Sequence, residues 1–142
     1  RLFELLPDVD RVLLVTTPSR ISRLVVSRSL RLVRESSPGA PGLVANMTEF
    51  VCPDCGSRTS LHPDDADDAG IPSELSGAEL WGRIPFDPRL AATTDRGRPV
   101  VAADPDSPSA RALEELADRV VRELDLLDPD SQERAAPREP EP

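Results

Sequence analysis

The stretch VLLVTTPSRISRLVVSRSLRLVRESSPGAPGLVA, residues 12–45, decides the fold class. It opens with the consecutive apolar residues Val12 to Val15, a run that suits a strand covered on both faces. From residue 19 apolar residues recur at helical spacing until Pro38-Gly39, which predicts a helix of about four turns. Leu43 to Ala45 then form a short strand. This order predicts a right-handed parallel crossover in an α/β fold.

Further segments downstream carry patterns of secondary structure. They are a short helical piece at 71–77, a strand at 80–84 broken by Pro85, an extended piece at 98–103 and a helix at 107–127. Ser107 and Pro108 are a good N-cap and first-turn pair for the last helix, whose apolar stripe should pack on the sheet. Trp81, on the third strand, is expected in the core.

Length and composition favour one domain, residues 1–127, followed by a tail. The chain has 142 residues, and its last fifteen, 128–142, are rich in proline and charge, so they are expected to be disordered. The net charge of -9 argues against a nucleic-acid partner, because such binding depends on clustered basic side chains. With no run of about 20 apolar residues and no secretory pattern, the sequence predicts a cytoplasmic protein without a membrane segment.

All basic residues are arginine, and this has a chemical consequence. A Walker A phosphate loop needs a lysine, so the chain as given cannot contain a complete one and is not expected to hydrolyse ATP by itself. The chain opens at Arg1 inside an amphipathic stretch, which is typical of a cut end.

The most informative residues are the pair Cys52 and Cys55, in the run Phe50-Val-Cys-Pro-Asp-Cys-Gly56. Two cysteines at this spacing can present both sulfurs to one metal centre. A structural zinc or a four-iron cluster normally takes four ligands, so a two-fold dimer with two such loops is the economical solution. A dimeric half-zinc site, a thiol-disulfide pair and two idle cysteines stay open as alternatives. His62 is expected in an exposed loop.

In combination, four segments of the chain resemble the Mrp/ApbC-type, MinD-like P-loop ATPases that carry iron-sulfur clusters. GLVANMTEFVCPDCG, residues 42–56, is similar to the segment where a strand ends in Asn-Met and runs into the cluster-binding Cys-x-x-Cys. VLLVTTP at 12–18, GRIPFDP at 82–88 and GRPVVAADPDSPSARALEELA at 97–117 resemble the family's other strands, loop and final helix. The resemblance covers residues 1–127.

This resemblance implies a doubly wound parallel-sheet fold of the deviant Walker class, with this chain as its C-terminal part and the phosphate-loop half preceding Arg1. It implies a homodimer that carries a 4Fe-4S cluster between subunits through Cys52 and Cys55 and passes it to apo-proteins. It also implies ATP with Mg in the complete family protein. Asn46 would then lie near the adenine, and the loop of Pro85, Phe86 and Asp87 would pack around the base. A turn role is the alternative for Asn46.

Overall fold

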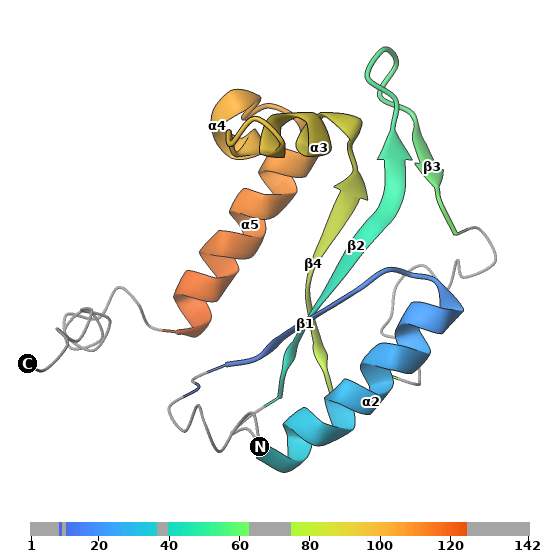
Figure 1. The fold of residues 1–142 in the computed structure, drawn as a ribbon, viewed down its shortest axis with the longest axis vertical. Helices are drawn as coiled ribbons and strands as arrows, with labels where there is room; N and C mark the ends of the chain where they lie inside the picture. Colours follow the sequence, from blue (N-terminus) through green and yellow to red (C-terminus); the bar gives the residue numbers. More distant parts are fainter. Residues whose placement is uncertain (1–8, 10, 37–39, 63–74, 125–142) are drawn as a thin grey trace, which may run out of the picture.

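The structure is a computed structural model, and it describes residues 9, 11–36, 40–62 and 75–124. The predicted tail at 128–142 and the acidic segment 63–70 lie outside these residues. The elements, in chain order, are β1 (Leu13–Thr16), α2 (Arg20–Ser36), β2 (Gly42–Val51), β3 (Arg58–Ser60), β4 (Glu79–Phe86), α3 (Pro88–Thr94), α4 (Val100–Ala103) and α5 (Pro108–Glu123) (Figure 1).

The strand β2 is the centre of the sheet. It pairs in parallel with β1 and with β4 along its first half, and β3 joins its far end in antiparallel fashion. The predicted parallel strand–helix–strand unit is therefore confirmed. Because the carboxyl ends of β2 and β4 point the same way, residues that follow them meet at one edge of the sheet, where open α/β sheets bind ligands (Figure 1).

The core lies on both faces of β2. Leu43 and Val44, which are adjacent and so point to opposite faces, are each only 2% exposed. Leu43 packs in a cluster with Leu30 of α2, and α5 runs along β4. Trp81 is buried as predicted. Ser107 caps α5 by accepting a hydrogen bond from the Ala110 N–H, which confirms the predicted helix start.

The expectation that Val12 to Val15 would be covered on both faces was wrong. The side chains of Leu13 and Val15 are 38% and 58% exposed, and those of Ile21 and Val25 on α2 are 77% and 60% exposed. In the described part of the chain, β1 pairs only with β2. The apolar run therefore predicted the strand correctly but not its surroundings.

Two strands are longer than predicted. β2 continues from Ala45 through Val51, up to the first cysteine, and β4 runs through Pro85 instead of breaking there. The register explains the proline: Asn46 pairs with Ile84 and Phe50 with Phe86, so Pro85 lies opposite an irregular stretch of β2. A proline is tolerated in a strand at such a bulge because no ladder hydrogen bond from its nitrogen is needed.

The stretch after β4 was also predicted wrongly. The expected extended piece at 98–103 contains the short helix α4, and α3, which precedes it, was not anticipated. Of the predicted helical piece at 71–77, residues 71–74 lie outside the described part of the chain; Leu75 belongs to a 3₁₀ turn, and Ser76 and Ala78 form an isolated bridge. Among the described residues, no helix combines the length and the apolar content needed to cross a membrane.

Candidate metal centre and neighbouring cavities

The two cysteines lie at the tip of a hairpin. β2 ends at Val51, the chain turns through residues 52–57, and it returns as β3 (Figure 1). The Cys52 N–H donates to the Ser57 carbonyl at 2.9 Å, and the Gly56 N–H donates to the Cys52 carbonyl at 2.9 Å. Gly56 has a φ of 70°, a conformation that glycine adopts without strain. The sequence thus closes a tight turn that carries both sulfurs.

The two thiols differ in their surroundings. Both are free, Cys52 is half-buried and Cys55 is exposed. The Cys55 Sγ lies 3.2 Å from the Ser57 Oγ, within hydrogen-bonding distance for sulfur. Hydrogen bonding with the Ser57 side chain and backbone, and with the Cys52 side chain, lowers the pKa of the Cys55 thiol from its usual value. A lowered pKa favours the thiolate, which is the form that binds metals.

An ion pair supports the base of the hairpin. Arg58 on β3 and Glu49 on β2 approach within 2.6 Å, and the neighbouring backbone pairs are Phe50 with Thr59 and Val51 with Arg58. The Arg58 side chain is 67% exposed, so this pair contributes at most about 1 kcal/mol. The ion pair instead helps to keep β2 and β3 in the register that places the two cysteines at the tip of the hairpin.

The hairpin of one chain offers the sulfurs of two free cysteines. Within residues 9, 11–36, 40–62 and 75–124, no three His, Cys, Asp or Glu side chains are grouped so that they could hold a metal ion. His62 is half-buried rather than exposed as expected, and its backbone N–H donates to the Ser60 Oγ. The exposed hairpin fits a metal or cluster that is completed by ligands from a second molecule.

The four residues predicted to contact a nucleotide lie around one cavity. Its volume is about 430 Å³, and Asn46, Pro85, Phe86 and Asp87 all line it. It lies beside the middle of β2 and the carboxyl end of β4, and its size falls within the range of about 300–1,000 Å³ that is typical of small-molecule sites. The rest of its wall comes from Met47, Ile84, Leu90, Ala91, Thr94, Pro99, Val100, Val101 and Leu113.

Residues from α3 and α4 were missed as part of this wall. The sequence does contain a signal for α3, since Asp87 followed by Pro88 is an N-cap and first-turn pair like Ser107 and Pro108. The short apolar run that opens α4 at Val100 looks equally like a strand, and periodicity cannot separate the two over four residues.

Asn46 lies just before a backbone irregularity. Its Oδ1 accepts a hydrogen bond from the Met47 N–H at 2.9 Å, and it is Met47, with a φ of 57°, that adopts the unusual conformation. The alternative for Asn46, a turn residue that tolerates an unusual backbone angle, is therefore not what the structure has, because Asn46 lies within β2 and the unusual angle belongs to Met47. The NH₂ group and the second lone pair of Oδ1 are what Asn46 can offer to a ligand.

Asp87 is tied into the protein by several hydrogen bonds. It accepts from the Arg89 N–H at 2.9 Å, the Arg89 guanidinium at 3.0 and 3.2 Å and the Ser109 hydroxyl at 2.7 Å. Burial by itself would raise the pKa of the Asp87 carboxyl, but the hydrogen bonds from Arg89 and Ser109 outweigh it and lower the pKa from 3.8. Asp87 thus shapes the cavity wall by joining α3 to the start of α5.

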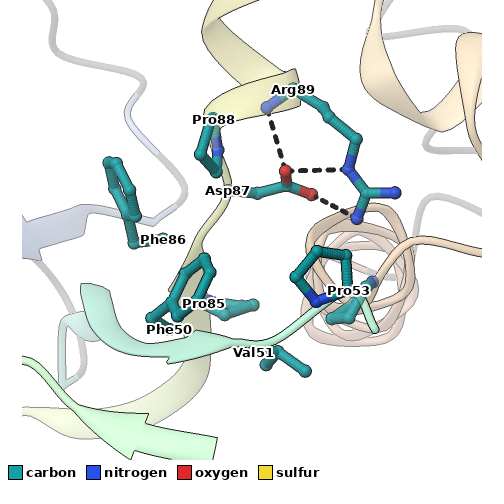
Figure 2. Close-up of a pocket in the computed structure, with 9 residues that line it drawn as sticks. Phe50, Val51, Pro53, Pro85, Phe86, Asp87, Pro88 and Arg89 are labelled. Atoms are coloured by element: carbon teal, nitrogen blue, oxygen red, sulfur yellow. Dashed lines mark hydrogen bonds and ion pairs between the residues drawn. The ribbon is translucent and has the colours of Figure 1, made fainter. Parts of the chain in front are cut away.

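A second, smaller cavity lies between this wall and the cysteine hairpin. Its volume is about 260 Å³, and Pro85, Phe86 and Asp87 line it together with Phe50 and Pro53 (Figure 2). Figure 2 shows the aromatic ring of Phe50 and the ring of Pro53 on one side, with Arg89 folded back onto Asp87 on the other. The segment of residues 85–87 therefore separates the larger cavity from the hairpin.

Comparison with known protein families gives a match over most of the chain. A profile described as ParA, NUBPL iron-transfer P-loop NTPase, matches residues 2–121. The iron-sulfur cluster carrier protein of Saccharolobus solfataricus is 32% identical over 119 residues, covering 84% of this chain and 40% of that protein. A cytosolic Fe-S cluster assembly factor of Caenorhabditis briggsae, a NUBP1 homolog, is 34% identical over 116 residues, covering 82% of this chain and 37% of the relative.

Solved structures show the same fold. The MinC:MinD cell division complex of Aquifex aeolicus matches with a TM-score of 0.61 and 26% identity, covering 82% of this chain and 44% of that chain. MinD alone from the same organism gives a TM-score of 0.60 over 80% of this chain. The predicted α/β fold of MinD-like P-loop proteins is confirmed. The chain spans about two fifths of the length of these relatives.

Proposed function

Because this chain belongs to the ParA family of NUBPL iron-transfer P-loop NTPases, we propose that it binds an iron-sulfur cluster and passes it to apo-proteins. The observation that carries the proposal is the position of Cys52 and Cys55 at the tip of an exposed hairpin. A cluster held there is reachable by the ligands of a recipient. The names of the relatives, an iron-sulfur cluster carrier and a cytosolic assembly factor, support both the cargo and a cytoplasmic location.

The cluster is a 4Fe-4S cluster bridging a homodimer. A four-iron cluster takes four thiolates, and each chain offers Cys52 and Cys55. A two-fold axis through the hairpin tips places two such pairs opposite each other. Few ligands per chain and an exposed position make the cluster easy to release, which a carrier requires.

The larger cavity is the adenine end of a nucleotide site whose phosphate part belongs to the rest of the family fold. Asn46 can donate from its amide to a ring nitrogen, while Pro85 and Phe86 offer apolar surface to the base. This chain has no lysine, so ATP and Mg are proposed for the complete family protein, and this chain is not expected to hydrolyse ATP by itself.

Adenosine should bind this chain weakly, with a Kd on the order of 1 mM, because about ten ring atoms contribute only roughly 0.3–0.4 kcal/mol each. Asn46→Ala should weaken binding about fivefold through loss of one hydrogen bond. Titration followed by NMR shifts of the β2 and β4 amides measures both. Guanosine is the matched ligand control; equal binding of adenosine by wild type and variant would contradict the assignment of Asn46.

The alternative is a non-catalytic dimeric module with zinc shared through Cys52 and Cys55. Zinc also takes four sulfurs in structural sites, so the hairpin geometry fits it equally. A thiol-disulfide role fits less well, because the cysteines lie between two strands rather than at a helix N-terminus that would stabilise a thiolate.

The transfer step is tested by mixing the cluster-loaded chain with an apo-ferredoxin under anaerobic conditions. The expected result is the appearance of holo-ferredoxin, followed by its circular dichroism, with matching loss of cluster from the carrier. A control reaction with free iron, sulfide and a chelator, but without this chain, gives the background formation of holo-ferredoxin. Retention of the cluster by the chain, with no holo-ferredoxin above this background, would refute the carrier role.

A further inference from the structure

The turn of the hairpin ends in a polar side chain that the proposed ligand set does not use. Ser57 is the last residue of the turn, and its carbonyl accepts from the Cys52 N–H at 2.9 Å. The next residue, Arg58, is held by β2 through its backbone pairing with Val51 and by its 2.6 Å ion pair with Glu49. The backbone on both sides of the Ser57 hydroxyl is therefore fixed. The hydroxyl itself lies 3.2 Å from the Cys55 Sγ.

We propose that Ser57 is a positioning residue that donates a hydrogen bond to the Cys55 sulfur and so sets the reduction potential of the bound cluster. This inference rests on the proposed function. In the free protein the thiol is the donor and the Ser57 Oγ accepts. When Cys55 holds iron it has lost its proton, so its sulfur can only accept, and the hydroxyl turns to donate.

The direction of the effect follows from charge. Reduction adds one electron to the cluster and makes the sulfurs more negative, so a hydrogen bond to sulfur stabilises the reduced state more than the oxidised one. The hydrogen bond therefore raises the potential. Because Cys55 is exposed, the effect is reduced by solvent; we expect about a tenfold change in the reduced-to-oxidised ratio, which is about 59 mV for one electron.

The placement also makes the two ligands of one chain unequal. Cys52 is half-buried at the end of β2, whereas Cys55 is exposed and faces the Ser57 hydroxyl. A donor on sulfur reduces its electron density and weakens its bond to iron. Cys55 is then the ligand that a recipient displaces first, and Ser57 adjusts how readily this happens.

The test uses the reconstituted chain and three variants. Ser57→Ala removes the hydroxyl, Ser57→Thr keeps it, and Ser60→Ala removes a hydroxyl of β3 that accepts a hydrogen bond from the His62 N–H instead. Redox titration with dithionite, followed by the electron paramagnetic resonance signal of the reduced cluster, gives each potential. Resonance Raman spectra in H₂O and D₂O report whether an exchangeable proton contacts the iron–thiolate bonds.

The expected result is a lower potential for Ser57→Ala by about 59 mV, with loss of the deuterium shift, and values close to wild type for Ser57→Thr and Ser60→Ala. If the Ser57→Ala variant binds the cluster with an unchanged potential and an unchanged deuterium shift, the role of Ser57 is overturned. The carrier proposal is then left intact. A wild-type chain that takes up no cluster overturns both.

Discussion

Replacing Cys52 with alanine is expected to abolish cluster binding. In a symmetric dimer the change removes two of four thiolates at once, and the remaining Cys55 pair cannot hold four irons. After anaerobic addition of iron and sulfide, the wild type should show a broad absorption at about 400 nm, which is typical of thiolate-bound clusters. Cys52→Ala should lack this absorption, and its bound iron should stay at background level.

The matched control is Thr59→Ala, an exposed position on β3 of the same hairpin that pairs with Phe50 through its backbone. It should bind as much iron as the wild type. Circular dichroism should show that both variants keep the fold, because Cys52 is only half-buried. Full cluster binding by Cys52→Ala would show that the ligands lie elsewhere in the chain.

Replacing Gly42 with alanine should give the largest loss of stability. A Cβ at this position would lie 2.6 Å from both the Leu13 Cδ2 and the Trp81 Cδ2. Trp81 cannot move aside easily, because it is 6% exposed, its Nε1 is 3.3 Å from Glu79, and its ring lies under Arg119. Forcing a methyl group into such a packed site costs about 1–3 kcal/mol.

Gly82→Ala is the matched control on the neighbouring strand. Neither Gly42 nor Gly82 has a positive φ, and the nearest contact of a Cβ at Gly82 is an ordinary 3.5 Å to the Leu116 Cδ1. Urea unfolding should give a free energy about 2 kcal/mol lower for Gly42→Ala and within about 0.5 kcal/mol of wild type for Gly82→Ala. Equal stability of the two variants would show that the contact of Gly42 with Trp81 is not tight.

Most of the parallel unit could be predicted from the sequence, because each element had an unambiguous local signal. The run from Val12 gave β1, the helical spacing from residue 19 gave α2, and Ser107 with Pro108 marked the start of α5. β3 has no such signal: Arg58–Ser60 is polar and exposed, and only pairing with β2 makes it a strand. Tertiary pairing likewise carries β4 through Pro85.

The candidate site was predicted in part for the same reason. Cys52 and Cys55 are recognisable by spacing, and the resemblance named Asn46 and the loop of Pro85, Phe86 and Asp87, which line one cavity. The hydrogen bonds from Ser109 to Asp87 and from Cys55 to Ser57 depend on how the chain folds back, and no spacing rule predicts them.

Whether two chains share one cluster through their hairpins can be measured by native mass spectrometry of the anaerobically reconstituted protein. We expect a dimer that carries four irons and four sulfides, and monomers once the cluster is removed. A colourless dimer with one zinc for two chains, or a monomer that carries a whole cluster, would contradict this expectation.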